Sequence, residues 1–77
     1  MRTYSYAKMI VDGKETAKLD IYREHNVFQI YDNDENVLSG SYHEAIKYIE
    51  GWKAKLNDIR KYLEAAGKFV SFEQTIK

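Results

Sequence analysis

The 77-residue chain contains no cysteine and no proline, and its formal net charge is zero. Without cysteine, disulfide bonds and cysteine-ligated zinc sites are excluded, and the absence fits a reducing compartment. Without proline, cis-proline switches are excluded. The two histidines, His25 and His43, are too few for the three or four converging ligands of a typical metal site. We therefore expect no metal and no other cofactor.

Long hydrophobic runs are also missing. No run approaches the roughly 18 apolar residues of a membrane helix, and the first residues contain no apolar segment of signal-peptide type. Hydrophobic residues make up 44% of the chain, which argues against disorder, and charged residues make up 31%, which favours solubility. A chain of this length is typical of one domain. We expect residues 1–77 to form a single cytoplasmic domain.

The zero net charge bears on the partners of the chain. Nucleic-acid-binding proteins usually carry a basic face, and mimics of nucleic acid are strongly acidic, whereas this chain as a whole is neither. Its charges are nonetheless unevenly placed. The hairpin region is acidic, and the second half of the predicted helix is mildly basic. Nucleic acid is thus a disfavoured partner, and no feature indicates a membrane.

Two β-strands joined by a tight turn are predicted at the start of the chain. Residues 3–11 are rich in types that favour strands. Asp12 and Gly13 follow, and Asp-Gly is typical of a type I′ turn because both central residues need positive φ. Residues 15–24 then alternate between Ala, Leu or Ile and polar side chains, which predicts an antiparallel strand half-buried on a core.

The next segments predict more of the same sheet. A turn at His25 and Asn26 leads into a third strand at residues 27–31. Residues 32–36 form a predicted polar turn, and residues 37–38 are either a short extension or a fourth strand. These short strands and turns indicate a β-meander, in which each strand pairs with the next.

A long amphipathic helix is predicted to begin at Ser41. Ser41 and Glu44 form a capping box, and Gly67 is the kind of residue that ends a helix. The apolar positions are spaced by three and four residues and form one stripe: Ala45, Ile49, Trp52, Leu56, Ile59, Leu63 and Ala66. The stripe stays in register across Gly51, which favours one helix over two. At roughly 37 Å, this helix is longer than the strands, so it is expected to overhang the sheet or to bend.

The tail is compatible with two structures. Val70, Phe72, Gln74 and Ile76 share one parity, which predicts a strand, whereas Ser71 and Gln74 fit a short terminal helix; we prefer the strand. The predicted fold is therefore α+β: an antiparallel β-meander of three to four strands packed on one long amphipathic helix, with a possible C-terminal strand.

No motif of catalysis or metal binding is complete. Asp32, Asp34 and Asn36 match the first three ligand positions of an EF-hand loop, but Val37 replaces the glycine that its sharp turn needs, and His43 replaces the bidentate glutamate. A solvated turn is the simpler interpretation. No serine lies in a nucleophile elbow, and no glycine pattern forms a phosphate-binding loop. We expect that the chain is not an enzyme.

The seven tyrosines are the most informative residues. Tyr22 has the parity of the polar face of its strand, and Tyr4 and Tyr6 share the parity of Lys8, so all three are expected on the outer face of the sheet, away from the helix. Tyrosine is enriched at protein interfaces. Cross-strand aromatic packing that stabilises a thin sheet is the alternative.

In size, layout and lack of motifs the chain resembles small phage-encoded anti-defence inhibitors, including anti-CRISPR proteins. That resemblance implies a protein that acts without chemistry, by occupying a surface of a larger complex. The Asp12-Gly13 hairpin and the run at residues 39–45 also resemble the three-stranded DNA-binding module of AP2 domains and integrase arms. In that family basic residues of the outer face contact the major groove, and here that face would offer Lys8, Lys14 and Lys18 beside Asp20 and Glu24.

We therefore expect a non-catalytic protein-binding module that inhibits or modulates a larger protein or nucleoprotein complex. Its acidic turns would face a basic groove of that partner. The predicted binding residues are Tyr4, Tyr6, Tyr22, Tyr31, Asp32, Asp34 and Glu35. The alternatives are a β-sheet DNA-binding module and a structural homodimer in which helix stripes pair around Leu56, Ile59 and Leu63.

Overall fold

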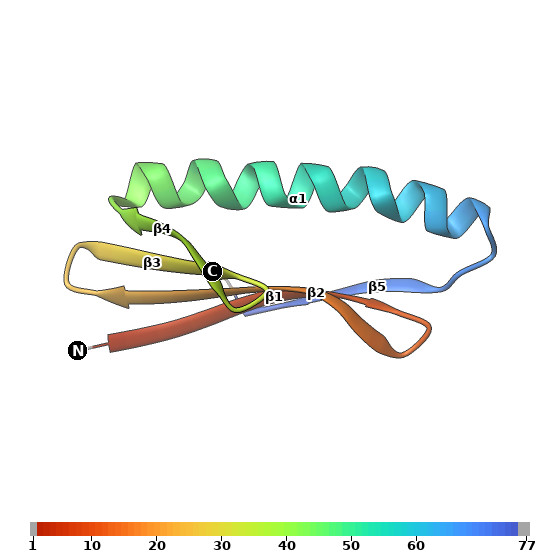
Figure 1. The fold of residues 1–77 in the computed structure, drawn as a ribbon, viewed down its shortest axis with the longest axis horizontal. Coiled ribbons are helices and arrows are strands. Elements are labelled where there is room, and N and C mark those ends of the chain that lie inside the picture. Colours follow the sequence, from red (N-terminus) through yellow and green to blue (C-terminus); the bar gives the residue numbers. More distant parts are fainter. Residues whose placement is uncertain (1, 76–77) are drawn as a thin grey trace.

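The computed structural model describes residues 2–75 and consists of a five-stranded antiparallel sheet with one helix across one of its faces (Figure 1). The elements are β1 (Arg2–Val11), β2 (Lys14–Glu24), β3 (Val27–Asp32), β4 (Glu35–Gly40), α1 (Tyr42–Ala65) and β5 (Val70–Gln74). The strand order is β4-β3-β2-β1-β5. The predicted α+β class is confirmed, with a four-stranded meander and a C-terminal strand beside β1. Ile76, which the tail prediction included, lies outside the described residues.

The turn between β1 and β2 has the conformation that its residues predict. Asp12 and Gly13 have φ angles of 51° and 82°, and positive φ at both central positions is what a type I′ turn requires. The tail is hydrogen-bonded to this turn, because the N–H of Asp12 donates to the carbonyl of Phe69 at 2.8 Å.

The turn between β3 and β4 is shorter than predicted. Only Asn33 and Asp34 form it, with φ angles of 49° and 70°, whereas residues 35 and 36 already belong to β4. The Asn33 side chain accepts a hydrogen bond from the N–H of Lys18 at 3.1 Å, and the N–H of Asn33 donates to the carbonyl of Lys18 at 3.0 Å. These bonds continue the β2 ladder into the turn, which is why a run of polar residues does not form a wide loop.

One uninterrupted helix crosses the sheet, as the stripe predicts. Ser41 is its N-cap: the N–H of Glu44 donates to the Ser41 hydroxyl at 3.5 Å, and that hydroxyl donates to the Glu44 carboxylate at 3.2 Å. Gly67 follows the helix with φ of 84°, a left-handed conformation that glycine adopts without strain. Gly51 lies inside the helix and does not break it.

The core lies between α1 and the facing side of the sheet. Leu19 and Ile30, in the two central strands of the meander, are fully buried. The other buried apolar residues are Ala7, Met9, Ile21, Ala45, Ile49, Trp52 and Leu56. Further along the stripe, Ile59 is 37% exposed. There the β1–β2 hairpin bends away from α1 (Figure 1), after a bulge that follows Met9.

The centre of the sheet is therefore expected to carry most of the stability. Leu19→Ala should lower the free energy of unfolding by about 2–5 kcal/mol, because it removes a fully buried side chain and leaves a cavity. Val27→Ala is the control, since Val27 is 50% exposed, and it should cost less than about 1 kcal/mol. Urea denaturation checks both values. Equal losses would contradict this account of the core.

Candidate functional site

Four tyrosines form one aromatic surface on the face of the sheet opposite α1. Ring centroids are 6.1 Å apart for Tyr4 and Tyr6, 5.1 Å for Tyr4 and Tyr22, and 5.7 Å for Tyr22 and Tyr31. We call these four residues the sheet-tyrosine cluster. The outer-face prediction for the first three is confirmed, and Tyr31 extends the cluster onto β3.

The register of the sheet brings these rings together. Tyr4 and Tyr22 are direct cross-strand partners, and Asp20 lies opposite both Tyr6 on one side and Tyr31 on the other. Side chains on a strand alternate between the two faces. Since Leu19 and Ile21 face the core, their neighbours on β2 necessarily face outward.

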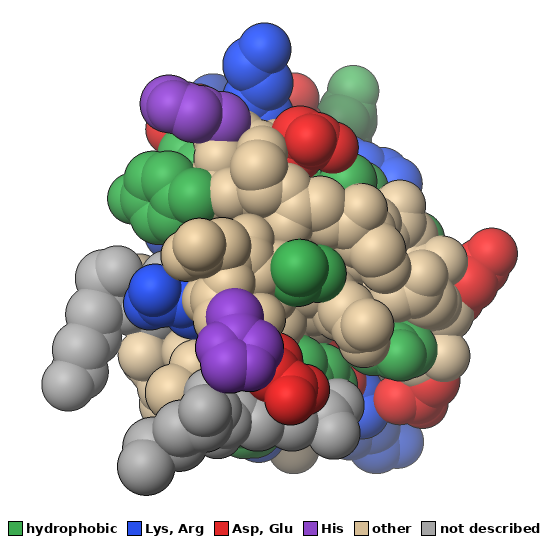
Figure 2. All heavy atoms as spheres, turned by 90° about the vertical axis from the view of Figure 1, so that its left-hand side faces the viewer, with side chains coloured by type: hydrophobic (Ala, Val, Ile, Leu, Met, Phe, Trp, Pro, Cys, Tyr) green, Lys and Arg blue, Asp and Glu red, His purple; other side chains and the backbone are tan. Residues whose placement is uncertain are grey.

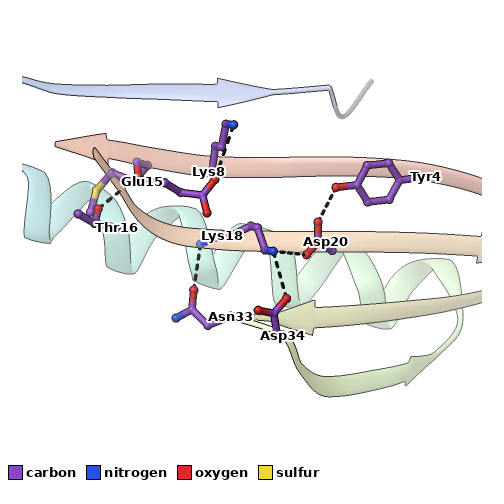
Figure 3. A network of polar contacts seen from close by, with 9 residues as sticks. Tyr4, Lys8, Glu15, Thr16, Lys18, Asp20, Asn33 and Asp34 are labelled. Carbon is purple, nitrogen blue, oxygen red and sulfur yellow. Dashed lines mark hydrogen bonds and ion pairs between the residues drawn. The ribbon is translucent and has the colours of Figure 1, made fainter. Parts of the chain in front are cut away.

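A chain of polar contacts crosses the cluster (Figure 3). The Tyr4 hydroxyl donates to Asp20 Oδ1 at 2.6 Å, and Lys18 Nζ lies 3.5 Å from Asp20 Oδ2 and 3.1 Å from Asp34 Oδ1. Asp20 is only 6% exposed, and a buried carboxylate is stable only where such partners compensate it. The chain thus ties β1, β2 and the β3–β4 turn together across the outer face.

These contacts shift two pKa values away from neutrality. The hydrogen bond to Asp20, followed by burial, raises the pKa of Tyr4 to about 12. The hydrogen bond to Asp34, followed by the charge of Asp20, also raises the pKa of Lys18. Acid–base catalysis favours groups that titrate near the working pH. With raised pKa values, the Tyr4 phenol remains a neutral hydrogen-bond donor and the Lys18 ammonium remains a cation over a wide pH range.

Lys8 is a second cation on the outer face, and it is paired as well. Its Nζ lies 3.6 Å from Glu15 Oε1 and 5.3 Å from the centroid of the Tyr6 ring. The surface is therefore aromatic with balanced charges at its borders.

The structure divides the predicted binding residues into two groups. Asp34 joins the cluster through Lys18, and Glu35 is exposed at the start of β4. Asp32, in contrast, points to the helix side, where its Oδ2 accepts a hydrogen bond from the Tyr48 hydroxyl at 2.9 Å. Because Asp32 follows Tyr31 on the same strand, the two side chains take opposite faces, and Asp32 does not lie with the tyrosines.

Two residues of the site were not among those predicted. Lys18 and Asp20 make the polar contacts of this face. They alternate along β2 with the core residues, as Tyr22 does, and therefore lie on the same face as Tyr22. The alternation of β2 was a sufficient signal for their face. Nothing in the local pattern indicated that Asp20 would be buried there.

A shallow hollow continues the outer face towards the β2–β3 turn. It has a volume of about 360 Å³ and is lined by Tyr22, Glu24, His25, Val27 and Gln29. Figure 2 looks at this end of the molecule, where acidic, basic and histidine side chains are interspersed with single hydrophobic ones. At this end of the molecule, neither acidic nor basic side chains dominate among the described residues.

The described residues contain neither a metal-binding cluster nor a membrane-spanning helix. Within residues 2–75, no group of three or more His, Cys, Asp or Glu side chains is placed to hold a metal ion. The helix in this range is not long and apolar enough to cross a membrane.

The Tyr4–Asp20 hydrogen bond predicts a specific titration. In the wild type the ring resonances of Tyr4 should titrate at about 12, and Asp20→Asn should move this pKa towards the ordinary value of 10.0. Tyr48, whose pKa burial and Asp32 raise to about 12, serves as the internal control and should not move. NMR-monitored titration checks both groups. An unchanged pKa of Tyr4 in the Asp20→Asn variant would contradict the role of the Tyr4–Asp20 hydrogen bond.

The same shifts set the sign of the alkaline pH dependence. The pKa values of Tyr4 and Tyr48 are higher in the folded protein than the ordinary value of 10.0. The contribution of these two tyrosines to stability is therefore complete below pH 10 and is lost as pH rises towards 12. Lys18, with its raised pKa, acts in the same direction. Tyr48→Phe should therefore make the free energy of unfolding fall less steeply as pH rises above 10.

Comparisons with known proteins do not assign the chain to a family. No family model, no curated protein and no solved structure matches it.

Proposed function

We propose that the chain is a non-catalytic protein-binding module that inhibits or modulates a larger protein or nucleoprotein complex, as phage anti-defence proteins do. The sheet-tyrosine cluster is the observation that carries this proposal. It lies on the face that α1 leaves uncovered, and Tyr4 is 52% exposed. Tyrosine supplies a large, rigid contact area with a polar tip, and it is enriched among residues that dominate binding energy.

The acidic turn beside the cluster supports a partner with a basic surface. The Asp34 side chain is 82% exposed although it contacts Lys18, and Glu35 is exposed next to it. Carboxylates at the border of an interface accelerate the approach of a basic partner and exclude acidic ones. We infer that the cluster provides affinity and that this turn provides orientation.

A DNA-binding module is less well supported. Affinity for DNA comes largely from lysine and arginine side chains that neutralise phosphates, and on this face Lys8 and Lys18 are already paired with Glu15, Asp20 and Asp34. A homodimer through the helix stripe is also less well supported, because Leu56 is only 5% exposed and Leu63 is partly buried against the core. Of the three residues expected to pair, only Ile59, at 37%, is exposed.

The proposal predicts that binding is lost when the outer face is altered. Tyr22→Ala combined with Asp34→Asn and Glu35→Lys should weaken the partner complex by about 2 kcal/mol or more, roughly thirtyfold in Kd. Asn is chosen at position 34 because Asp34 has a φ angle of 70°, which Asn tolerates. The partner is captured from an extract of cells that encode the chain, and its affinity is then titrated.

Tyr62→Ala is the matched control. Tyr62 is 81% exposed, but it lies on α1, away from the cluster. This variant should bind as the wild type does, and circular dichroism should show that all variants are folded. Undiminished binding by the outer-face variant would refute the proposal, as would a loss caused by Tyr62→Ala alone.

A further inference from the structure

The last strand presents an open edge. β5 pairs with β1 on one side, and no strand of the described residues lies on its other side. The N–H of Thr75 donates to Tyr6 and the carbonyl of Phe69 accepts from Asp12, so the odd-numbered residues direct their backbone groups to β1. Alternation then directs the N–H and C=O groups of Val70, Phe72 and Gln74 outward.

The opposite edge of the sheet, β4, is less suited to pairing. Its register with β3 shifts between Ile30 and Tyr31, and the Asn36 amide donates to the carbonyls of Ile30 and Leu38 at 3.5 and 3.4 Å. Bulges of this kind discourage edge pairing. β5 has no such shift, so its edge is the better template for another strand.

A groove runs between this edge and α1. It has a volume of about 350 Å³, and its apolar part consists of Ala7, Trp52 and Phe72. Phe72 is 39% exposed, and the guanidinium of Arg60 lies 5.8 Å from the centroid of its ring. A side chain from an added strand would thus meet an aromatic surface with a cation above it.

The helix side of the groove is cationic. Lys53 borders it and is in no ion pair among residues 2–75. Arg60 Nε lies 3.5 Å from Glu64 Oε1 but makes no hydrogen bond within the described residues. Glu73 also borders the groove, although it lies opposite Lys8 on the outer face. These cations complement a carboxylate that approaches from the β5 edge.

We propose that the β5 edge accepts an extended acidic segment of a partner protein as a sixth strand, with Asp or Glu side chains directed at Lys53 and Arg60. Main-chain hydrogen bonds to Val70, Phe72 and Gln74 provide the affinity, and the groove selects the side chain, as in other cases of strand addition. This site is separate from the sheet-tyrosine cluster, so it stands whether or not that cluster binds a protein.

The positive charges beside the groove argue against a second copy of the chain as its occupant. Two copies joined antiparallel through β5 would be related by a two-fold axis, as closed dimers are. Their helices would then bring Lys53 and Arg60 of one copy towards the same residues of the other. Like charges across an interface are unfavourable, whereas an acidic segment neutralises them.

The test uses a blocked peptide of about nine residues, the length of a strand, that alternates Glu and Val. A peptide that alternates Lys and Val is its control. At millimolar concentration the Glu peptide should slow hydrogen exchange at the amides of Val70, Phe72 and Gln74, and the Lys peptide should not. Equal effects of the two peptides, or no effect, would overturn the proposal.

Two double variants and one control separate the contributions of charge and backbone. Lys53→Glu with Arg60→Glu should weaken binding of the Glu peptide about tenfold and make the chain prefer the Lys peptide. Lys61→Glu, on the same helix, is the control and should change the binding of neither peptide. Val70→Pro with Gln74→Pro removes outward N–H groups without removing bonds to β1, and it should abolish binding of the Glu peptide.

Sedimentation without peptide completes the experiment. A monomer is expected. A dimer in which these same three amides are protected would identify a second copy as the occupant and would overturn the proposal.

Discussion

The packing of one helix stripe against one face of the sheet is the interaction on which everything else depends. Leu19 and Ile30 are fully buried in one core cluster with Trp52 and its neighbours on α1, and the chain has no disulfide to add to this packing. A sheet that is covered by a helix on one side only has two layers. Its second face must therefore meet either solvent or a partner.

Tyrosine suits that second face, because it packs across strands and also tolerates water. The rings of the sheet-tyrosine cluster contact one another across three strands, which stabilises the sheet in the absence of a partner. Asp20 and Lys18 hold the polar groups among them in fixed positions. A structural role and a binding role are thus compatible, since the contacts that stiffen the sheet also prepare a rigid surface.

Local patterns in the sequence predicted the elements and their faces better than they predicted the contacts. Alternation in β2 was sufficient to place Tyr22 on the outer face, and the spacing of Ser41 and Glu44 located the start of α1. The position of β5 beside β1 depends on contacts between distant residues, which no local pattern encodes. Asp32 was grouped with the tyrosines because it adjoins the acidic turn. Strand alternation directs its side chain to the helix side instead, where it accepts a hydrogen bond from Tyr48.

The central claim is that α1 covers one face of the sheet and leaves the sheet-tyrosine cluster accessible. A soluble paramagnetic agent tests it most directly, because such an agent broadens the NMR signals of groups that solvent reaches. The account predicts strong broadening of the Tyr4 ring and measurable broadening of the other rings of the cluster, with little effect on Trp52 and Leu19. Protected cluster rings together with a broadened Trp52 would contradict it.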